Sequence, residues 1–368
     1  MKQRDVIDNL IRGKKADRVG LYDSPWPETI QKWRDENNLK NSYEENQEEQ
    51  EEDPIIHFGF DKCSVGGWFD NLPIPGVLEV IEESDKWQVT RDGAGASLKF
   101  WKHKSGTPEH IDFKMTSREI WEKDYRRHLL KVDKRRLDIE NAKKLLEKRK
   151  KQGLWTFYGH LFIWETMRKS LGDICMMESL LLDQDWIHDY NRVYTDFYKE
   201  HFRVLIEEAG KPDGIWLYED LGYSNGLFCS PKTLEELFIP YYKEIVDFFH
   251  SMDLPVVLHS CGNINAGIPL IVEAGFDALN PMEAKAGCDA LILAEKYGDK
   301  LAFIGGLDAR VLESGDKDLI KREVIRIVEG MKFQGARYIF GSDHSVSPLV
   351  EYEDFKYAID IYREHMLY

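Results

Sequence analysis

The amino-acid sequence predicts a single closed (β/α)8 barrel, also called a TIM barrel. From residue 154 onward, short apolar runs alternate with helical patterns, which is typical of a parallel sheet whose strands are joined by helices. The chain has 368 residues and is therefore long enough for such a barrel. It contains no Gly-x-Gly-x-x-Gly segment, which favours a closed barrel over an open nucleotide-binding sheet.

The strands can be assigned in order along the chain. Residues 3–12 have the spacing of a short amphipathic helix, and residues 17–23 then form the first strand candidate. The apolar run at 55–60 is the second strand candidate. Six further strands are predicted at 154–158, 214–218, 255–259, 277–280, 301–305 and 337–341.

An insertion is predicted between the second and third strands. Residues 85–116 alternate apolar and polar positions around a turn at Asp92, which indicates a β-meander. Residues 117–152 have a helical pattern. We interpret the segment around 85–150 as an excursion from one domain that spans residues 1–368.

The composition excludes several classes of partner. The 66 acidic residues outnumber the 50 lysines and arginines and give a formal net charge of −16, which argues against nucleic acid or an anionic membrane. No run of about 18 apolar residues is present, and the N-terminus lacks the apolar core of a signal peptide. We therefore expect a cytoplasmic protein. Its five cysteines are odd in number, so we expect reduced thiols that are free to bind metal.

Three residues near the ends of predicted strands suggest a zinc site. His259 and Cys261 stand two residues apart at the end of an apolar run, so the period of a strand points both to one side. Spacing alone favours a core histidine beside a buried thiol, and the other strand ends are what favour zinc. His344 follows the last strand and would supply a third ligand, or else bond as a loop histidine to Asp343 or a backbone carbonyl. Three ligands and an open fourth position are typical of catalytic zinc.

Other polar residues at the predicted strand ends complete a candidate active site. In a (β/α)8 barrel, catalytic residues stand at the carboxyl ends of the strands. Acidic residues there are candidate proton donors or further ligands, and aromatic or polar ones are candidates for binding substrate. The catalytic candidates are Glu219, Asp220 and Asp343, and the substrate-binding candidates are Tyr22, Trp26, Tyr158, Tyr218 and Asp308.

Four segments resemble a known family. Ile-Arg-Gly-Lys-Lys-Ala-Asp-Arg-Val at 11–19, Leu-Leu-Leu-Asp at 180–183, Gly-Leu-Phe-Cys-Ser-Pro at 226–231 and Ile-Pro-Tyr-Tyr at 239–242 are similar to signatures of the uroporphyrinogen decarboxylase superfamily. The resemblance covers residues 5–362 and implies a single (β/α)8 barrel. Homodimers are common among barrels of this superfamily, so a homodimer is also possible.

Within that superfamily, the resemblance favours the cobamide-dependent methyltransferases. True decarboxylases carry Arg-Gln-Ala-Gly-Arg after the first strand, whereas residues 23–27 here read Asp-Ser-Pro-Trp-Pro without an arginine. A substrate with many carboxylates needs such cations. The zinc motif of the methyltransferases is His-x-Cys followed much later by a third ligand, commonly Cys. His259-Ser260-Cys261 matches its first part, and His344 stands near the place of the late ligand.

The resemblance implies an O-demethylase component as the leading function. A small-molecule O-methyl donor, in the first place a methoxylated aromatic compound, would pass its methyl group to Co(I). No corrinoid-binding Asp-x-His-x-x-Gly segment occurs, so the cobamide is expected on a separate corrinoid-binding protein. A neutral His in place of Cys would leave zinc more electrophilic and better suited to an ether. The alternatives are a methylcobamide:thiol methyltransferase of the coenzyme M type and a metal-free decarboxylase or lyase.

Overall fold

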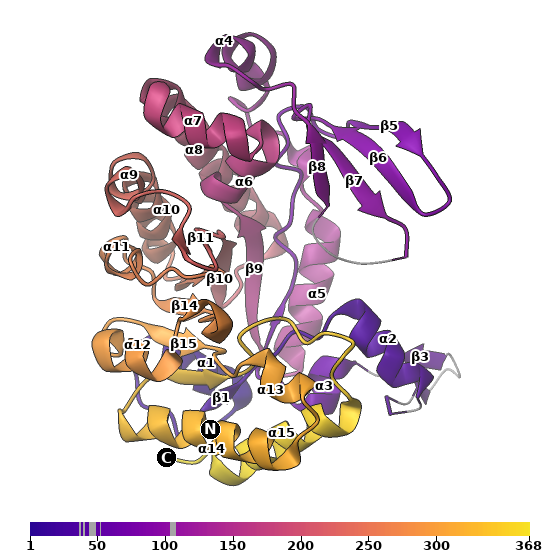
Figure 1. The fold of residues 1–368 in the computed structure, drawn as a ribbon, viewed down its shortest axis with the longest axis vertical. Coiled ribbons are helices and arrows are strands. Elements are labelled where there is room, and N and C mark those ends of the chain that lie inside the picture. Colours follow the sequence, from indigo (N-terminus) through magenta and orange to yellow (C-terminus); the bar gives the residue numbers. More distant parts are fainter. Residues whose placement is uncertain (37, 40, 44–48, 52, 104–107) are drawn as a thin grey trace.

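Eight parallel strands form one sheet in the computed structural model (Figure 1). The structure describes residues 1–36, 38–39, 41–43, 49–51, 53–103 and 108–368. The strand order is β1-β16-β15-β14-β13-β10-β9-β4. The strands are β1 (Gly20–Leu21), β4 (Lys62–Ser64), β9 (Trp155–Leu161), β10 (Gly214–Tyr218), β13 (Val256–His259), β14 (Ala278–Asn280), β15 (Ala302–Ile304) and β16 (Tyr338–Phe340).

Contacts between its first and last strands nearly close this sheet into a barrel. The backbone N–H of Asp61, just before β4, donates to the carbonyl of Leu21 in β1 at 2.9 Å. The guanidinium of Arg18 donates to both carboxylate oxygens of Asp61 at 2.7 Å, and the Leu21 N–H donates to one of them at 2.8 Å. The predicted (β/α)8 barrel is therefore confirmed.

The strand predicted at 55–60 is wrong, because this stretch begins with a short helix, α3 (Pro54–Phe58). The side chain of Asp53 accepts a hydrogen bond from the Ile55 N–H, and Pro54 occupies the first turn. Gly59 ends the helix with φ of 71°, a left-handed conformation that glycine adopts without strain. These capping signals outweigh the apolar run, and the barrel strand is instead β4.

Helices surround the barrel on its outer side (Figure 1). None of the described helices has the length and apolar character needed to cross a membrane. The helices along the barrel are α1 (Gln3–Ile11), α2 (Pro27–Asp35), α6 (Ile163–Leu171), α7 (Asp173–Leu182), α8 (Gln184–Ala209), α9 (Pro231–Leu237), α10 (Ile239–Ser251), α11 (Ile268–Glu273), α12 (Ala290–Tyr297), α13 (Ala309–Glu313), α14 (Lys317–Phe333) and α15 (Tyr352–His365). The shorter elements are the hairpins β2 (Asn41–Tyr43) with β3 (Glu49–Glu51) and β11 (Gly222–Tyr223) with β12 (Gly226–Leu227), and the 3-10 turn η4 (Ala284–Ala286).

The predicted meander is present as a separate four-stranded antiparallel sheet that projects from the barrel (Figure 1). It begins at residue 78, earlier than predicted, and residues 104–107 of the predicted insertion lie outside the described residues. The helical pattern that follows is interrupted, and only its last part forms a long helix. The elements are β5 (Leu78–Glu83), β6 (Trp87–Asp92), β7 (Ser97–Trp101), β8 (Glu109–Asp112), α4 (Arg118–Ile120), the π-turn η1 (Trp121–Tyr125), the 3-10 turns η2 (Arg126–His128) and η3 (Lys134–Arg136), and α5 (Ile139–Lys151).

Two apolar clusters form the core, one inside the barrel and one between the strands and helices. Inside the barrel, large side chains of β9 and β10, among them Trp155, Phe157 and Trp216, pack against apolar residues of α1. Helix α1 therefore packs against the interior of the barrel. Neighbouring positions of β9, such as Tyr158, belong to the other cluster and pack toward the helices, as the alternation of a strand requires.

Arg18→Met tests the contact that closes the barrel. The variant leaves the buried Asp61 carboxylate without its cation, and we expect the free energy of unfolding to fall by about 3–5 kcal/mol. Urea denaturation at pH 7 measures this loss. As a control, Arg322→Met removes an exposed guanidinium on α14 and should change the value by less than about 0.5 kcal/mol. Equal effects of the two variants would contradict the role given to Arg18.

Candidate functional site

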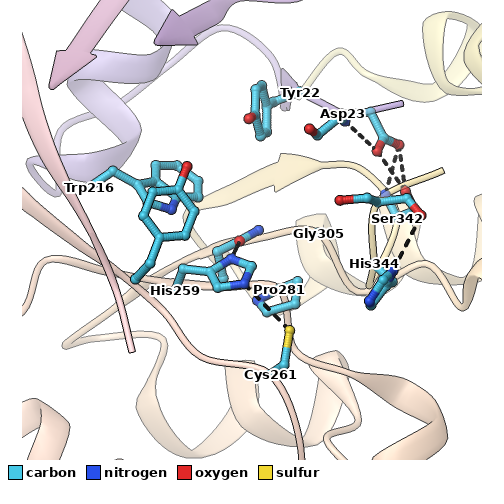
Figure 2. A pocket seen from close by; sticks show the side chains of 13 residues that line it. Tyr22, Asp23, Trp216, His259, Cys261, Pro281, Gly305, Ser342 and His344 are labelled. Atoms are coloured by element: carbon cyan, nitrogen blue, oxygen red, sulfur yellow. Dashed lines mark hydrogen bonds between the residues drawn. The ribbon is translucent and has the colours of Figure 1, made fainter. Parts of the chain in front are cut away.

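A cavity of about 120 Å³, called the central cavity here, lies at the carboxyl ends of the barrel strands (Figure 2). Residues at the ends of β1, β10, β13, β14, β15 and β16 contribute to its wall. The lining residues are Tyr22, Asp23, Ser24, Trp216, Tyr218, His259, Cys261, Asn280, Pro281, Gly305, Ser342, His344 and Ser345. The cavity therefore occupies the place where a (β/α)8 barrel carries its catalytic residues.

Asp220, His259 and Cys261 bring three possible metal-binding atoms together at the edge of this cavity, which His259 and Cys261 line. One atom from each residue lies within 4.8 Å of the others. The Cys261 Sγ is 3.4 Å from His259 Nε2, which in turn is 3.9 Å from Asp220 Oδ1. The backbone N–H of Cys261 donates to the same Asp220 oxygen at 3.0 Å and so holds this carboxylate beside the other two groups. We call these residues the donor group.

Hydrogen bonds orient His259 for metal binding. Its Nδ1 lies 2.5 Å from Asn280 Oδ1, while the Asn280 Nδ2 donates to the Ile304 carbonyl at 3.0 Å. The asparagine therefore presents an acceptor to the histidine, which puts the ring proton on Nδ1 and the free lone pair on Nε2, facing the donor group. Burial lowers the pKa of His259, so its ring is neutral, as a metal ligand must be.

The donor group fits a zinc ion. Nitrogen, sulfur and carboxylate oxygen are the usual protein ligands of Zn²⁺, and three of them leave one position open. Burial raises the pKa of the Cys261 thiol, with a further contribution from the adjacent Asp220. A bound divalent cation reverses that effect and holds the sulfur as thiolate.

His344 lies apart from the donor group. It lines the same cavity, but Figure 2 shows it on the side of Asp23 and Ser342. Its Nδ1 is 3.3 Å from the Ser345 carbonyl, and its ring packs edge-on against Trp26 with centroids 6.2 Å apart. The structure thus brings the predicted ligands His259 and Cys261 together and places Asp220 beside them. Ligation by His344 stays a prediction.

Three of the predicted acids serve the framework instead of lining the central cavity. The buried Glu219 carboxylate accepts hydrogen bonds from the Trp164 and Glu165 N–H groups at the start of α6 and from the Tyr242 hydroxyl. Asp343 accepts from the backbone N–H groups of Ala284 and Ala309 at 2.8 Å, and Asp308 caps α13. These carboxylates fix backbone segments around the mouth, a role that strand-end position alone does not distinguish from catalysis.

The predicted aromatic residues divide between the two faces of the barrel wall. Tyr22 and Tyr218 line the central cavity, and their role in substrate binding stays a prediction. Trp26 contacts His344 but is not part of the lining. Tyr158 points outward, where its hydroxyl donates to the Gly210 carbonyl at 2.9 Å. Its assignment to substrate binding is wrong, because it occupies the outward phase of β9.

A second cavity of about 380 Å³, called the side cavity here, adjoins the donor group. It shares Tyr218, His259 and Cys261 with the central cavity and falls in the range of roughly 300–1,000 Å³ that small-molecule sites occupy. Trp68 is 50% exposed and lies against the Tyr218 ring with centroids 5.2 Å apart. The lining residues are Trp68, His110, Leu161, Glu165, Arg168, Lys169, Tyr218, Asp220, Gly222, Phe228, His259 and Cys261.

Sequence reasoning gave no role to two titratable groups of the barrel interior, Asp23, which lines the central cavity, and Lys62, which contacts two of the aromatic rings that line it. Asp23 accepts hydrogen bonds from the Ser342 hydroxyl and N–H, and burial raises the pKa of Asp23 to about 6. Lys62 is fully buried, with its Nζ 3.2 Å from the ring centroid of Tyr22 and 3.5 Å from that of Trp216. Burial lowers the pKa of Lys62. Asp23 ends the first predicted strand but was not among the candidates, and the wrong second strand concealed Lys62.

Comparisons with known proteins agree with this architecture. The family model described as uroporphyrinogen decarboxylase (URO-D) matches residues 175–365, more than half of the chain. No curated protein sequence matches. Among solved structures, a methyltransferase from Methanosarcina mazei is similar with a TM-score of 0.68 and 16% identity over 99% of both chains, which shows a shared fold. A B12-independent methionine synthase from Shewanella sp. W3-18-1 has a TM-score of 0.43 and 13% identity over 84% of this chain and 83% of its own.

Asp220→Ala and His344→Ala distinguish the two possible third ligands. Loss of a ligand should weaken zinc binding by about 100-fold or more, so we expect this loss in Asp220→Ala. His344→Ala should change the affinity by less than about threefold, because His344 lies outside the donor group. Competition with a chromogenic chelator measures both affinities. The reverse order would make His344 the ligand.

Asn280→Leu tests the hydrogen bond that orients His259. The variant removes the acceptor from Nδ1, and we expect zinc affinity to fall about 10–100-fold, as is typical when the hydrogen-bond partner of a histidine ligand is lost. The matched control is Asn265→Leu, which changes an exposed asparagine whose bonds go to Asn263 and Gly287. An unchanged affinity in Asn280→Leu would show that His259 is oriented without this bond.

Proposed function

The chain belongs to the uroporphyrinogen decarboxylase family, and within it we propose that the protein is a zinc-dependent methyltransferase. It takes a methyl group from an O-methyl donor, a methoxylated aromatic compound, and passes it to the Co(I) of a separate corrinoid protein. The observation that carries this proposal is the donor group of Asp220, His259 and Cys261 at the barrel mouth. The fold shared with a protein described as a methyltransferase is consistent with it.

In this reaction, the bond between the methyl carbon and the aryl oxygen breaks, and its electron pair stays on oxygen. The two electrons of Co(I) form the new bond to the methyl carbon. A zinc ion held by the donor group would supply a Lewis acid for the ether oxygen, which would make the phenolate a better leaving group. The residues of the chain then have to place the ether at this group, exclude water and deliver a proton.

The aromatic wall of the side cavity supports an aromatic substrate. Trp68 and Tyr218 lie one beside the other, and Phe228 also lines this cavity. Such faces bind a flat ring by stacking and by excluding water from it. Because Tyr218 also lines the central cavity, a ring held here can place a substituent at the donor group.

Asp23 is the proton donor that the geometry offers to the departing oxygen. It lines the central cavity, and its pKa of about 6 leaves part of the carboxyl groups protonated near neutral pH. The Ser342 hydroxyl and N–H hold the carboxyl group in place. Glu219, another acid predicted as a proton donor, instead accepts hydrogen bonds from the backbone N–H groups at the start of α6.

Two alternatives receive less support. With Asp220 as the third donor, the ligands His, Cys and Asp carry the same total charge as one His and two Cys. The charge of the ligands therefore does not favour an ether over a thiol as substrate. The aromatic wall of the side cavity favours the ether. Decarboxylation of a substrate with many carboxylates requires several free cations. None of the residues that line the central cavity is a lysine or an arginine, and of the two cations that line the side cavity, Arg168 is already paired with Glu165 and Asp173, which leaves Lys169.

A methyl-transfer assay tests the proposed function. Zinc-loaded protein, a reduced corrinoid protein and 2-methoxyphenol are combined, and the absorption spectrum of methyl-cobalt is followed. We expect methyl transfer, and a rate at least about 100-fold lower in His259→Ala, because the donor group is then incomplete. Addition of a chelator should abolish the transfer and zinc should restore it.

The control is Arg322→Met, whose exposed side chain on α14 is remote from the donor group and should leave the rate unchanged. Turnover with a thiol and methylcobamide, without transfer from any methoxylated aromatic compound, would replace the proposal by the thiol methyltransferase. Activity that survives complete removal of zinc would favour a metal-free lyase.

A further inference from the structure

The side cavity contains a lysine whose ammonium makes no ion pair or hydrogen bond among the described residues. Lys169 lies in the last turn of α6 and lines the cavity half-buried. The acid that interacts with its charge is Glu165, one helical turn earlier, whose carboxylate is bonded to Arg168. Arg168 is held by Glu165 at 2.7 Å and by Asp173 at 3.0 Å. The ammonium of Lys169 is therefore the group in this cavity that can attract an anion, against the negative net charge of the chain and the carboxylates of Glu165 and Asp220 in the same lining.

His110 lines the same cavity from the meander. It comes from β8, so the insertion and the barrel helix α6 both contribute to this wall. Burial lowers the pKa of His110, and the nearby Arg168 and Lys169 lower it further. The ring is therefore neutral at pH 7 and can donate one N–H to an anion. Its ring contacts Phe113 edge-on, with centroids 5.5 Å apart.

A substrate in the side cavity would contact two regions of different charge, the donor group with Asp220 and the cation Lys169. Glu165 interacts electrostatically with Asp220 of the donor group and also with Lys169. Because the carboxylate of Glu165 is bonded to Arg168, the ammonium of Lys169 is available to bind an anion. Trp68, Tyr218 and Phe228 provide aromatic faces in the same cavity.

We propose that Lys169 and His110 form a subsite for the carboxylate of an aromatic acid, so that the substrate is a methoxybenzoate-type anion and not a neutral ether. Binding of the acid at this subsite is independent of the proposed function, whereas transfer of its methyl group rests on that function. A charge-assisted bond from the ammonium to the carboxylate, in a partly buried place, is the interaction that selects the acid. A lysine that merely complements the end of the α6 dipole would show no such selection.

Equilibrium binding tests the subsite without turnover. Isothermal titration calorimetry on the zinc-loaded full chain at pH 7 compares 4-methoxybenzoate with its neutral analogue 4-methoxybenzamide. We expect the benzoate to bind about tenfold or more tightly, and Lys169→Met to reduce this preference to within about threefold. Lys169→Arg keeps the cation and should retain most of the preference. His110→Phe should lower it by about threefold.

The matched control is Lys151→Met, which removes an exposed lysine from the equivalent last turn of α5 and should leave the preference unchanged. Equal binding of benzoate and benzamide by the unmodified protein, or a full preference in Lys169→Met, would overturn the subsite. Tighter binding of 2-mercaptoethanesulfonate than of 4-methoxybenzoate would overturn the aromatic acid as its ligand.

The two proposals fail separately. If methyl transfer from 2-methoxyphenol succeeds but the benzoate preference does not depend on Lys169, only the subsite is wrong. If the preference depends on Lys169 but no ether donates its methyl group, the subsite stands and the proposed reaction is wrong.

Discussion

The contact between Arg18, Asp61 and Leu21 nearly closes the eight-stranded sheet into a barrel, and the site depends on that contact. Without this contact, the two edge strands β1 and β4 would expose unpaired backbone groups. By holding β1 beside β4 at one edge while β1 pairs with β16 at the other, it fixes where β1 ends. Asp23 then lies against Ser342 at the end of β16, and the first and last strands share one cavity.

The alternation of strand residues decides which strand-end residues reach the cavity, and the sequence shows this phase only in part. Barrel strands are buried on both faces, so their apolar runs do not reveal which residue points inward. The sequence predicts that His259 and Cys261 lie together because residues two positions apart on a strand point to the same side, whichever side that is. Tyr158 required the absolute phase of β9 and was assigned to the wrong face. Lys62 could not be found, because the apolar run at 55–60 predicts a strand there, whereas the capping signals of Asp53 and Pro54 make it a helix and move the strand to β4.

The adjacent carboxylates Glu219 and Asp220 show why a strand-end acid is an ambiguous signal. They follow the same strand, β10, but face different partners. Asp220 stays at the mouth and accepts the Cys261 N–H, which aligns it with the other donors. Glu219 turns into the wall, where it receives the two N–H groups that begin α6. Burial raises the pKa of Glu219, and its three hydrogen bonds oppose this rise. The sequence predicts a functional pair, whereas only neighbouring elements determine the role of each.

The anchor at Glu219 also links the two regions that a substrate would contact. Because it fixes the start of α6, it sets the position of Glu165 and Lys169 on that helix relative to Asp220 at the end of the same strand. The opposite wall has a different origin, since His110 belongs to the inserted meander. The barrel ends thus carry the donor group, while one helix and the insertion shape the cavity beside it. In such an arrangement, changes in the insertion alter which substrate binds, while the donor group stays the same. One barrel scaffold can accommodate different substrates in this way.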